Sequence, residues 1–398
     1  MENSESVNQS QEGGGPSKKR RITRKNKNSM QIETKAEACC SWFLLPLDIM
    51  VDILSRLPTK SIAKLRCVCK HWLSLTQDLS LLKSLHQRSS SYMIIFKHVF
   101  NEEIRLKLYD SSIRDGEKDT KISFSPKLWR RYYKLSNFVD GLTCAYSWYT
   151  KSDMYLLNPM TRELRRIRKN YGRQKGFESE HERVGLGIDM STGKYKIVRL
   201  FSHSKSRFHC EIFTVGTAQW RCLGETPFGI CYDHNPILLH GALHWIGSDH
   251  QQKLGVFRFN LKDEKFGSII PILHPPSSHI RRLKESSGSL CIEFSNTVEK
   301  CFEIWVMKDY LSNTWVKEYK VDTSDSTGLH ITESIDSKFI LESCEEEKEY
   351  VNSKYRFNKA FNLLKIGREL GRDFAVHKGS LISPKKLLKL SQKTYEEA

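Results

Sequence analysis

Hydrophobic residues between positions 45 and 72 recur at the three- and four-residue spacing of amphipathic helices. The first run ends at Pro58, and Thr59 or Ser61 can cap a second helix that follows it. Asp78 can cap a further helix that runs to about Arg88. A unit of this size buries too little surface to be stable alone, so we expect part of its apolar face to contact a partner.

Beyond residue 91 the pattern changes to short aliphatic or aromatic runs between polar turns, which predicts β-strands as far as about residue 360. Pairs of apolar residues, seven apart in most cases, enclose a polar turn and predict hairpins. The pairs are Leu157 and Leu164, Ile188 and Tyr195, Phe213 and Trp220, Phe259 and Phe266, and the longer-spaced Met307 and Trp315. The later repeats suit four-stranded propeller blades, but the earlier ones are too short, so an irregular sandwich is the alternative.

Positive charge is concentrated near the start of the chain. The net charge is +18, and residues 18–27 lie in a polar, glycine-rich leader that we expect to be disordered. This run is typical of a nuclear import signal, with a nucleic-acid-binding arm or a solvated charge run as alternatives. Its basic residues are Lys18, Lys19, Arg20, Arg21, Arg24, Lys25 and Lys27. We therefore expect the protein in the nucleus, with or without a cytoplasmic fraction.

A second basic cluster, Arg165, Arg166 and Arg168, closes the first of the predicted hairpins. It can recognise an acidic substrate segment by charge complementarity, or it can be a solvated loop face.

Candidate chemistry is sparse. No apolar run reaches the roughly 18 residues of a membrane span, and the N-terminus does not resemble a secretory signal. Gly193-Lys194 lacks the spacing of a phosphate-binding loop, and His240 and His244 are predicted to be structural histidines on a strand. The eleven cysteines have no zinc-site spacing. We expect no catalytic residues, cofactor or metal.

Four tryptophans of the β region are predicted to fill the interior between strands, and a ligand-binding aromatic cage is the alternative. They are Trp220, Trp245, Trp305 and Trp315.

The helical segment resembles the F-box, the adaptor-binding module of SCF-type ubiquitin ligases. The match runs through Leu45-Pro46, Asp48-Ile49, Ile53 to Pro58, and Arg66 to Trp72. The resemblance implies that a Skp-family adaptor binds here, and through it a cullin and a RING subunit. The residues implied are Leu45, Pro46, Ile49, Ile53, Leu54, Leu57, Pro58, Leu65, Val68 and Trp72. The sequence does not divide them between the partner surface and the core of the module.

The β region resembles the F-box-associated domain of a large plant family, whose domains are similar to kelch-like propellers. The matching motifs are Asn158-Pro159-x-Thr161-Arg162, Gly185-x-Gly187-x-Asp189, Tyr195-Lys196-x-Val198-Arg199, Gln219-Trp220-Arg221, Gly241 to Trp245, Phe259-Asn260-Leu261-x-x-Glu264-x-Phe266, and Glu303 to Met307. Asn260 stands where an Asp is usual.

The sequence thus predicts an α+β multidomain protein, with a small all-α F-box followed by an all-β, kelch-like propeller. The expected segments are a leader at 1–38, the F-box at 39–90, the β domain at 91–376 and a basic tail at 377–398. The tail reads as a short amphipathic helix or a frayed end.

The expected function is a non-catalytic receptor that brings an unidentified protein substrate to an SCF-type ligase. The alternatives are a nuclear nucleic-acid-binding protein, although we do not expect nucleic acid as a partner, and a propeller that binds carbohydrate or another small ligand.

Overall fold

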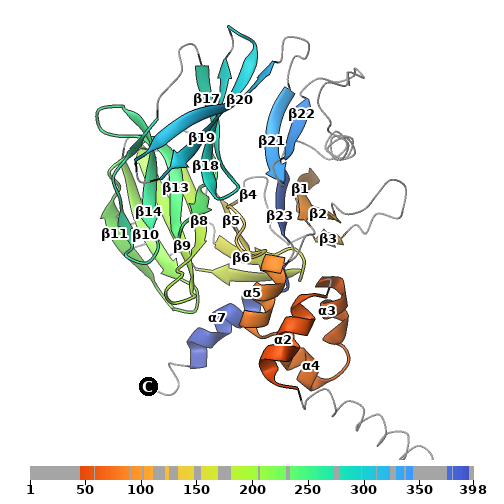
Figure 1. Ribbon diagram of the computed structural model, residues 1–398. Coiled ribbons are helices and arrows are strands. Elements are labelled where there is room, and N and C mark those ends of the chain that lie inside the picture. Colours follow the sequence, from red (N-terminus) through yellow and green to blue (C-terminus); the bar gives the residue numbers. More distant parts are fainter. Residues whose placement is uncertain are drawn as a thin grey trace, which may run out of the picture. The chain divides into compact units, whose positions relative to one another are not determined.

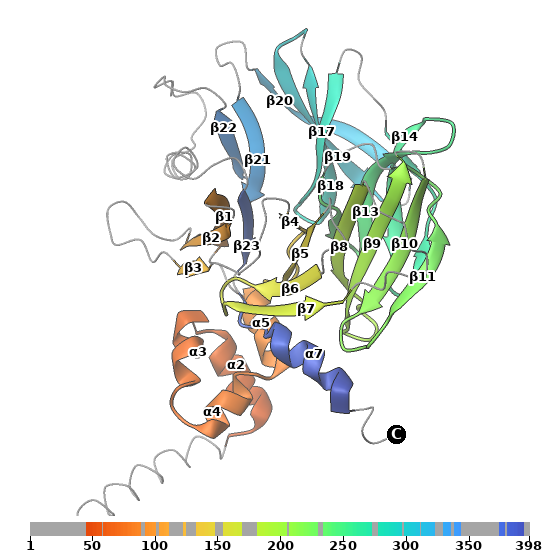
Figure 2. The ribbon, with the colours of Figure 1, turned by 180° about the vertical axis from the view of Figure 1, so that it is seen from behind.

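The computed structural model describes residues 45–57, 59–88, 92–100, 103–110, 122–124, 133–147, 154–168, 181–204, 207–229, 234–272, 278–296, 298–310, 312–322, 329–335, 338–343, 374–378 and 380–393 (Figures 1 and 2). The chain falls into two compact units, Met1–Arg56 and Leu57–Ala398. Within the described ranges, no helix is both long enough and apolar enough to cross a membrane.

The predicted helices are present. They are α2 (Leu47–Ser55), α3 (Thr59–Leu65), α4 (Lys70–Leu75) and α5 (Leu79–Arg88). Pro46 precedes α2 with extended backbone, and its carbonyl accepts the first helical bond, from Met50. The Asp78 carboxylate accepts a hydrogen bond from the Leu81 amide at 3.0 Å, so Asp78 caps α5 as predicted.

Four antiparallel sheets follow one another along the chain, and their strands pair in sequence order except for β16 in the third. The first contains β4 (Tyr133–Leu135), β5 (Thr143–Ser147), β6 (Met154–Asn158) and β7 (Glu163–Ile167). The second contains β8 (His181–Ile188), β9 (Tyr195–Ser204), β10 (Arg207–Thr214) and β11 (Trp220–Glu225). The third contains β12 (Ile237–Leu239), β13 (Ala242–Ser248), β14 (Leu254–Asn260), β15 (Lys265–Phe266) and β16 (Ile270–Pro271), which pairs with β14. The fourth contains β17 (Ser278–Ser286), β18 (Ser289–Asn296), β19 (Cys301–Asp309) and β20 (Thr314–Asp322).

Another sheet unites the two ends of the β region. Its strands are β1 (Tyr92–Phe100), β2 (Glu103–Asp110), β3 (Ile122–Phe124) and β23 (Phe374–Lys378). Strand β23 pairs with β1, so that Val376 lies opposite Ile94. It continues to Lys378, two residues past the boundary at 376 that the sequence suggested. Strands β21 (Leu329–Ile335) and β22 (Lys338–Ser343) form a separate hairpin.

The hairpins predicted from paired apolar residues are confirmed by the strand register. In each of the five pairs, the opening and closing residues lie directly opposite one another on neighbouring strands. The turns contain a residue with positive φ, which is glycine in two of them and Arg162, Glu264 or Asn313 in the others. These turns therefore use the left-handed conformation that tight reversals require.

An Asn or Asp side chain organises three of these turns. The side-chain oxygen of Asn158 accepts a hydrogen bond from the Met160 amide at 2.9 Å, and that of Asp189 accepts one from the Ser191 amide at 3.0 Å. Asn260 does the same for the Lys262 amide at 2.8 Å. Because the bond needs only the oxygen, Asn260 serves as well as the Asp that is usual there.

Neighbouring sheets pack closely face to face. Phe228 and Phe257 stack at 3.9 Å between ring centroids in a core shared by the second and third sheets. A Cβ atom on Gly185 would lie 2.9 Å from the Leu243 side chain, and one on Gly187 would lie 2.3 Å from Leu261. The Gly-x-Gly motif is therefore explained by the close approach of two sheets.

The C-terminal helix α7 (Pro384–Lys393) packs against β6 and β7 (Figures 1 and 2). Of the two readings of the tail, the helix is the one that the described residues adopt.

Candidate functional site

Helix α2 has apolar residues on two faces, and only one of these faces is buried. Met50 and Leu54 are buried, whereas the side chains of Ile49 and Ile53 are 48% and 36% exposed. Each pair is four residues apart and so occupies one side of the helix. Leu54 therefore belongs to the core, and Ile49 and Ile53 are available to a partner.

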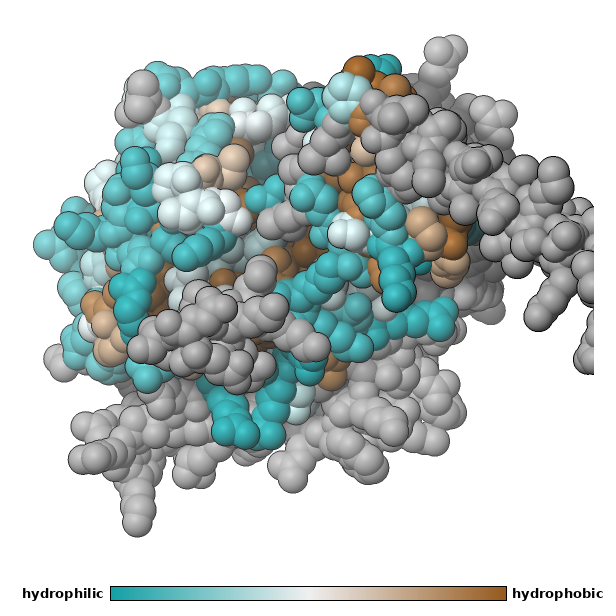
Figure 3. All heavy atoms as spheres, turned by 90° about the horizontal axis from the view of Figure 1, so that it is seen from below, coloured by the Kyte–Doolittle hydropathy of each residue, from teal (hydrophilic) through white to brown (hydrophobic). Residues whose placement is uncertain are grey.

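The segment from α3 to α4 also divides into core and surface. Ile62 and Trp72 are buried and Leu65 is half-buried, while Val68 is 59% and Leu73 37% exposed. Trp72 is one of the residues that the sequence left undivided between the partner surface and the core, and its burial places it in the core. The prediction did not include exposed Leu73, because this residue follows Trp72 directly and so falls outside the three- and four-residue spacing of the predicted apolar stripe. On the face drawn in Figure 3, hydrophobic side chains reach the surface in small groups among hydrophilic ones.

The remaining predicted adaptor residues lie at the helix ends. Leu45 is half-buried, and Pro46 and Leu57 are exposed. Pro58 lies outside the described residues, as does the whole predicted import segment at 18–27.

The predicted basic surface is split between the two faces of β7. Alternation along β7 places Arg166 on one side and Arg165 on the other with buried Ile167, while Arg168 lies one residue past the end of the strand. Arg166 and Arg168 are exposed, and Arg165 is half-buried. The Arg168 carbonyl accepts a hydrogen bond from the Trp220 indole at 2.9 Å. Only Arg166 and Arg168 can therefore present adjacent charges to one partner.

A buried lysine joins the second sheet to the third. The Lys196 ammonium lies 3.0 Å from the Asp189 carboxylate and 2.9 Å from that of Glu264, and it donates to the Leu261 carbonyl at 2.6 Å. Glu264 also pairs with Arg221. Residues from four of the sequence motifs thus meet in one charge cluster.

The cluster keeps its carboxylates ionised. Burial by itself raises the pKa of Asp189, but hydrogen bonds from Ser191 and Lys196 outweigh burial and hold that pKa well below its usual range. The pKa of Glu264 is likewise lowered, because Lys196 and Arg221 outweigh the effect of burial. The arrangement is a linkage between sheets, since every charged group in it already has a partner.

A second buried charge cluster lies within one sheet. The Arg199 guanidinium contacts Glu182 at 3.2 Å and Glu211 at 2.9 Å, which ties β9 to the strands on either side. It also lies over the Phe201 ring, 4.2 Å from the centroid. The two basic residues of the Tyr195-Lys196-x-Val198-Arg199 motif therefore have structural partners.

The two histidines have structural roles. His244 is fully buried in β13, and its ring nitrogens contact the Ile237 carbonyl, at 3.2 Å, and the Tyr310 hydroxyl. Burial lowers the pKa of His244 to about 4, so the imidazole is neutral near pH 7. The sequence suggested that His240 lies on a strand, but it lies in the turn before β13 with φ +48°. Its ring meets the edge of Tyr310.

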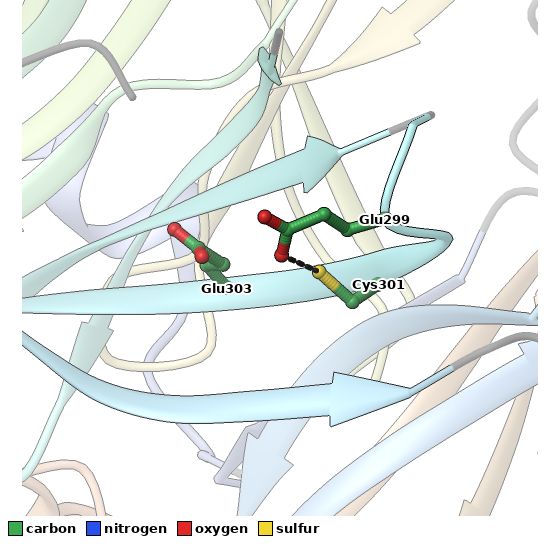
Figure 4. A group of neighbouring side chains, drawn as sticks. All are labelled: Glu299, Cys301 and Glu303. Carbon is green, nitrogen blue, oxygen red and sulfur yellow. Dashed lines mark hydrogen bonds between the residues drawn. The ribbon is translucent and has the colours of Figure 1, made fainter. Parts of the chain in front are cut away.

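Glu299, Cys301 and Glu303 bring three potential metal-binding atoms within 4.8 Å of one another (Figure 4). Lys320 binds the Glu299 carboxylate at 2.6 Å, and Lys317 binds that of Glu303 at 3.1 Å. Because both carboxylates are already neutralised by lysines, the group is better described as a pair of salt bridges on β19 and β20 than as a ligand set.

The tryptophans do not assemble a ligand cage. Trp220, Trp245 and Trp315 are buried, as predicted for interior packing, and Trp315 donates to the Pro271 carbonyl at 3.1 Å. Trp305 is half-buried and donates to Glu303 at 3.0 Å.

Comparison with known families gives two matches. The family model described as F-box domain matches residues 42–84, and that described as F-box associated beta propeller domain matches residues 91–378. Among curated proteins of Arabidopsis thaliana, F-box protein At3g07870 is 28% identical over 322 residues, which cover 72% of this chain and 74% of the relative. F-box/kelch-repeat protein At3g23880 is 24% identical over 294 residues, covering 67% and 76%.

Similarity to solved structures is low. Prolyl oligopeptidase B from Galerina marginata aligns with a TM-score of 0.37 and 13% identity, over 63% of this chain and 36% of that chain. An exo-beta-1,3-galactanase from Clostridium thermocellum aligns with a TM-score of 0.33 and 10% identity, over 47% of each chain. TM-scores below 0.5 do not support a shared fold or a shared activity.

Proposed function

Because the chain belongs to the plant F-box proteins that carry an F-box-associated beta propeller domain, we propose that it is the substrate-recognition subunit of an SCF-type E3 ubiquitin ligase. The F-box binds a Skp-family adaptor and thereby a cullin and a RING subunit. The β domain holds a protein substrate. The chain itself is not catalytic, and its contribution is to raise the local concentration of substrate lysines near the charged conjugating enzyme.

The observation that carries this proposal is the unused apolar face of α2. One exposed aliphatic residue is ordinary on a protein surface. Here Ile49 and Ile53 lie together on one exposed stripe of the helix, while the neighbouring stripe, with Met50 and Leu54, is buried. A helix with a second apolar face that its own fold leaves exposed is suited to a partner's hydrophobic groove.

Replacing Ile49 and Ile53 with Gln tests adaptor binding. Exposed positions contribute little to the core, so the variant should melt like wild type. Adaptor recovery in co-purification should be lost, since truncating a buried interface anchor costs about 2 kcal/mol or more. Val298, which is 75% exposed in the turn before β19, supplies the matched control as Val298→Gln. Undiminished adaptor recovery by the double variant would refute the proposal.

For the β domain we propose that Arg166 and Arg168 form part of the substrate surface and meet an acidic segment. Both are exposed, Arg166 on β7 and Arg168 one residue past the end of that strand. Their charge would accelerate association with an acidic partner more than it would strengthen the bound complex. The substrate itself can be identified by affinity purification under cullin inhibition.

For location we propose nuclear import through the basic segment at 18–27. Changing Lys18, Lys19, Arg20 and Arg21 to Ala should shift a fluorescent fusion toward the cytoplasm. The same number of alanine changes at the exposed residues Lys253, Lys262, Lys265 and Lys300, in the β domain, controls for charge alone. Nuclear accumulation equal to wild type would assign import to another segment or to a partner.

A further inference from the structure

Residues 380–383 form a short segment outside helix and strand, which is hydrogen-bonded to both the helical segment and the first sheet and which we call the strap. Ser380, Leu381 and Ile382 are all nearly inaccessible to solvent. A Cβ atom on Gly141, whose φ is +77°, would lie 2.5 Å from the Ser380 side chain. The strap therefore packs so closely against the turn before β5 that position 141 accommodates only glycine.

Asn158 holds the strap from the side of the sheet. Its side-chain amide donates to the Ser380 carbonyl at 3.0 Å and to the Ile382 carbonyl at 2.8 Å, while its oxygen accepts from the Met160 amide. The side chain is fully buried. Both amide hydrogens are thus committed to the strap, which distinguishes Asn158 from Asn260, whose oxygen organises a similar turn.

Glu163 fixes the next residues, where α7 begins. Its carboxylate accepts hydrogen bonds from the Ser383 hydroxyl and from the Lys385 amide. The Ser383 hydroxyl in turn accepts from the Lys386 amide at 3.3 Å, as an N-cap residue does. A negative charge beside the first turn of α7 also favours the helix dipole.

Arg66 holds the strap from the opposite side. Its guanidinium donates to the Leu381 carbonyl at 3.0 Å and to the Thr76 carbonyl, at the end of α4, at 3.0 Å. Successive carbonyls of the strap thus have partners on opposite sides. The sheet therefore binds the carbonyls of residues 380 and 382, and the helical segment binds the carbonyl of residue 381 between them.

We propose that the strap is a clasp that fixes helices α3 and α4 to the first sheet, and that Arg66, Asn158 and Glu163 are positioning residues for ubiquitin transfer. The second part rests on the proposed function. A receptor that delivers substrate lysines to a conjugating enzyme needs a defined geometry between the adaptor-bound helices and the substrate-bound sheets.

The physical test uses the full chain and needs no partner. Asn158→Asp keeps the oxygen that organises the turn but replaces the donor with an acceptor that faces two carbonyls. Hydrogen exchange in residues 381–393 should become about tenfold faster or more. Asn260→Asp makes the same chemical change in a turn that does not touch the strap, and exchange there should match wild type. Exchange in Asn158→Asp equal to that in the control would overturn the clasp.

Orientation is measured separately, with a fluorescent amino-acid pair at the exposed positions Ser74 and Val298. Single-molecule energy transfer should give one narrow distribution for wild type and a broader one for Arg66→Met and for a chain ending at residue 379. Equal widths in all three would show that something other than the strap fixes the helices.

The functional arm uses the assembled ligase and the substrate that co-purifies with it. Arg66→Met and Asn158→Asp should keep adaptor and substrate recovery but slow ubiquitin transfer several-fold and spread it over more lysines. Unchanged ubiquitin-transfer rates and an unchanged set of modified lysines would refute the positioning role. Whether the strap acts as a clasp would then be judged from the hydrogen-exchange and energy-transfer results. If the wild-type chain fails to bind any adaptor, the proposed function fails and those two measurements still stand.

Discussion

Lys196 shows at the scale of one residue how two sheets are joined by charge. Its ammonium is buried between Asp189, from the turn of one sheet, and Glu264, from the turn of the next. Removing one partner from a buried ion pair leaves an uncompensated charge, which is more destabilising than the intact pair is stabilising. Loss of the lysine alone should therefore destabilise the fold more than replacing Lys196, Asp189 and Glu264 together with neutral residues.

Lys196→Met should lower the free energy of unfolding by about 3 kcal/mol or more at pH 7, measured by urea denaturation. Adding Asp189→Asn and Glu264→Gln to it should restore much of that loss, because Asn retains the turn oxygen and no buried carboxylate remains unpaired. A denaturation midpoint for Lys196→Met equal to that of wild type would contradict this account.

The same cluster sets a pH dependence. Both carboxyl groups have a lower pKa folded than unfolded, so their contribution is complete above the unfolded values of about 4 and declines as the pH falls below them. Wild type should therefore lose stability on acidification more steeply than the triple variant.

At the scale of an element, β7 presents two unlike faces. Arg166 is exposed on one, next to exposed Arg168 just past the end of the strand, whereas half-buried Arg165 shares the other with Ile167. The sequence treated the three arginines as one surface because strand alternation matters only once the strand and its register are known.

Charge reversal at the exposed arginines and at Arg165 should therefore distinguish a specific contact with the substrate from an effect of the overall charge of the protein. Arg166→Glu with Arg168→Glu should slow association with the co-purified acidic substrate and reduce its salt dependence, while Arg165→Glu should have a smaller effect. Association rates at two salt concentrations give the result, with circular dichroism as the folding control. Equal effects of the two charge reversals, or none, would place the substrate surface elsewhere. Strong salt-dependent binding of a labelled nucleic acid would favour the alternative function.

Local patterns in the sequence were sufficient for the hairpins and helices. Paired apolar residues such as Phe259 and Phe266 predicted cross-strand partners, because hairpin register depends on nearby residues. The family of the chain was also recognisable from its motifs. The sequence did not show which F-box residues, such as Trp72, are buried in the core. It also did not show the hydrogen bonds from Asn158 to the strap, since a contact across 222 residues leaves no local spacing to read.

At the scale of the whole molecule, β23 completes the sheet that β1 begins. Ending the chain at residue 373 removes β23, whereas ending it at residue 379 removes only the strap and α7. The shorter chain should show rapid proteolysis within residues 92–124, and the longer one should be protected there, as judged by limited digestion and mass spectrometry. Equal digestion of the two chains would show that β23 does not stabilise this sheet.

The pairing of β1 with β23 also has a consequence for synthesis on the ribosome. Ile94 emerges long before its partner Val376, and at about 5–20 residues per second the interval is roughly 15–60 s. During that time β1, a strand rich in Ile, Phe and Val, has one edge without its partner strand. A nascent chain of this protein therefore exposes an aggregation-prone edge until translation is nearly finished, and a premature stop codon close to the end of the gene would make that exposure permanent.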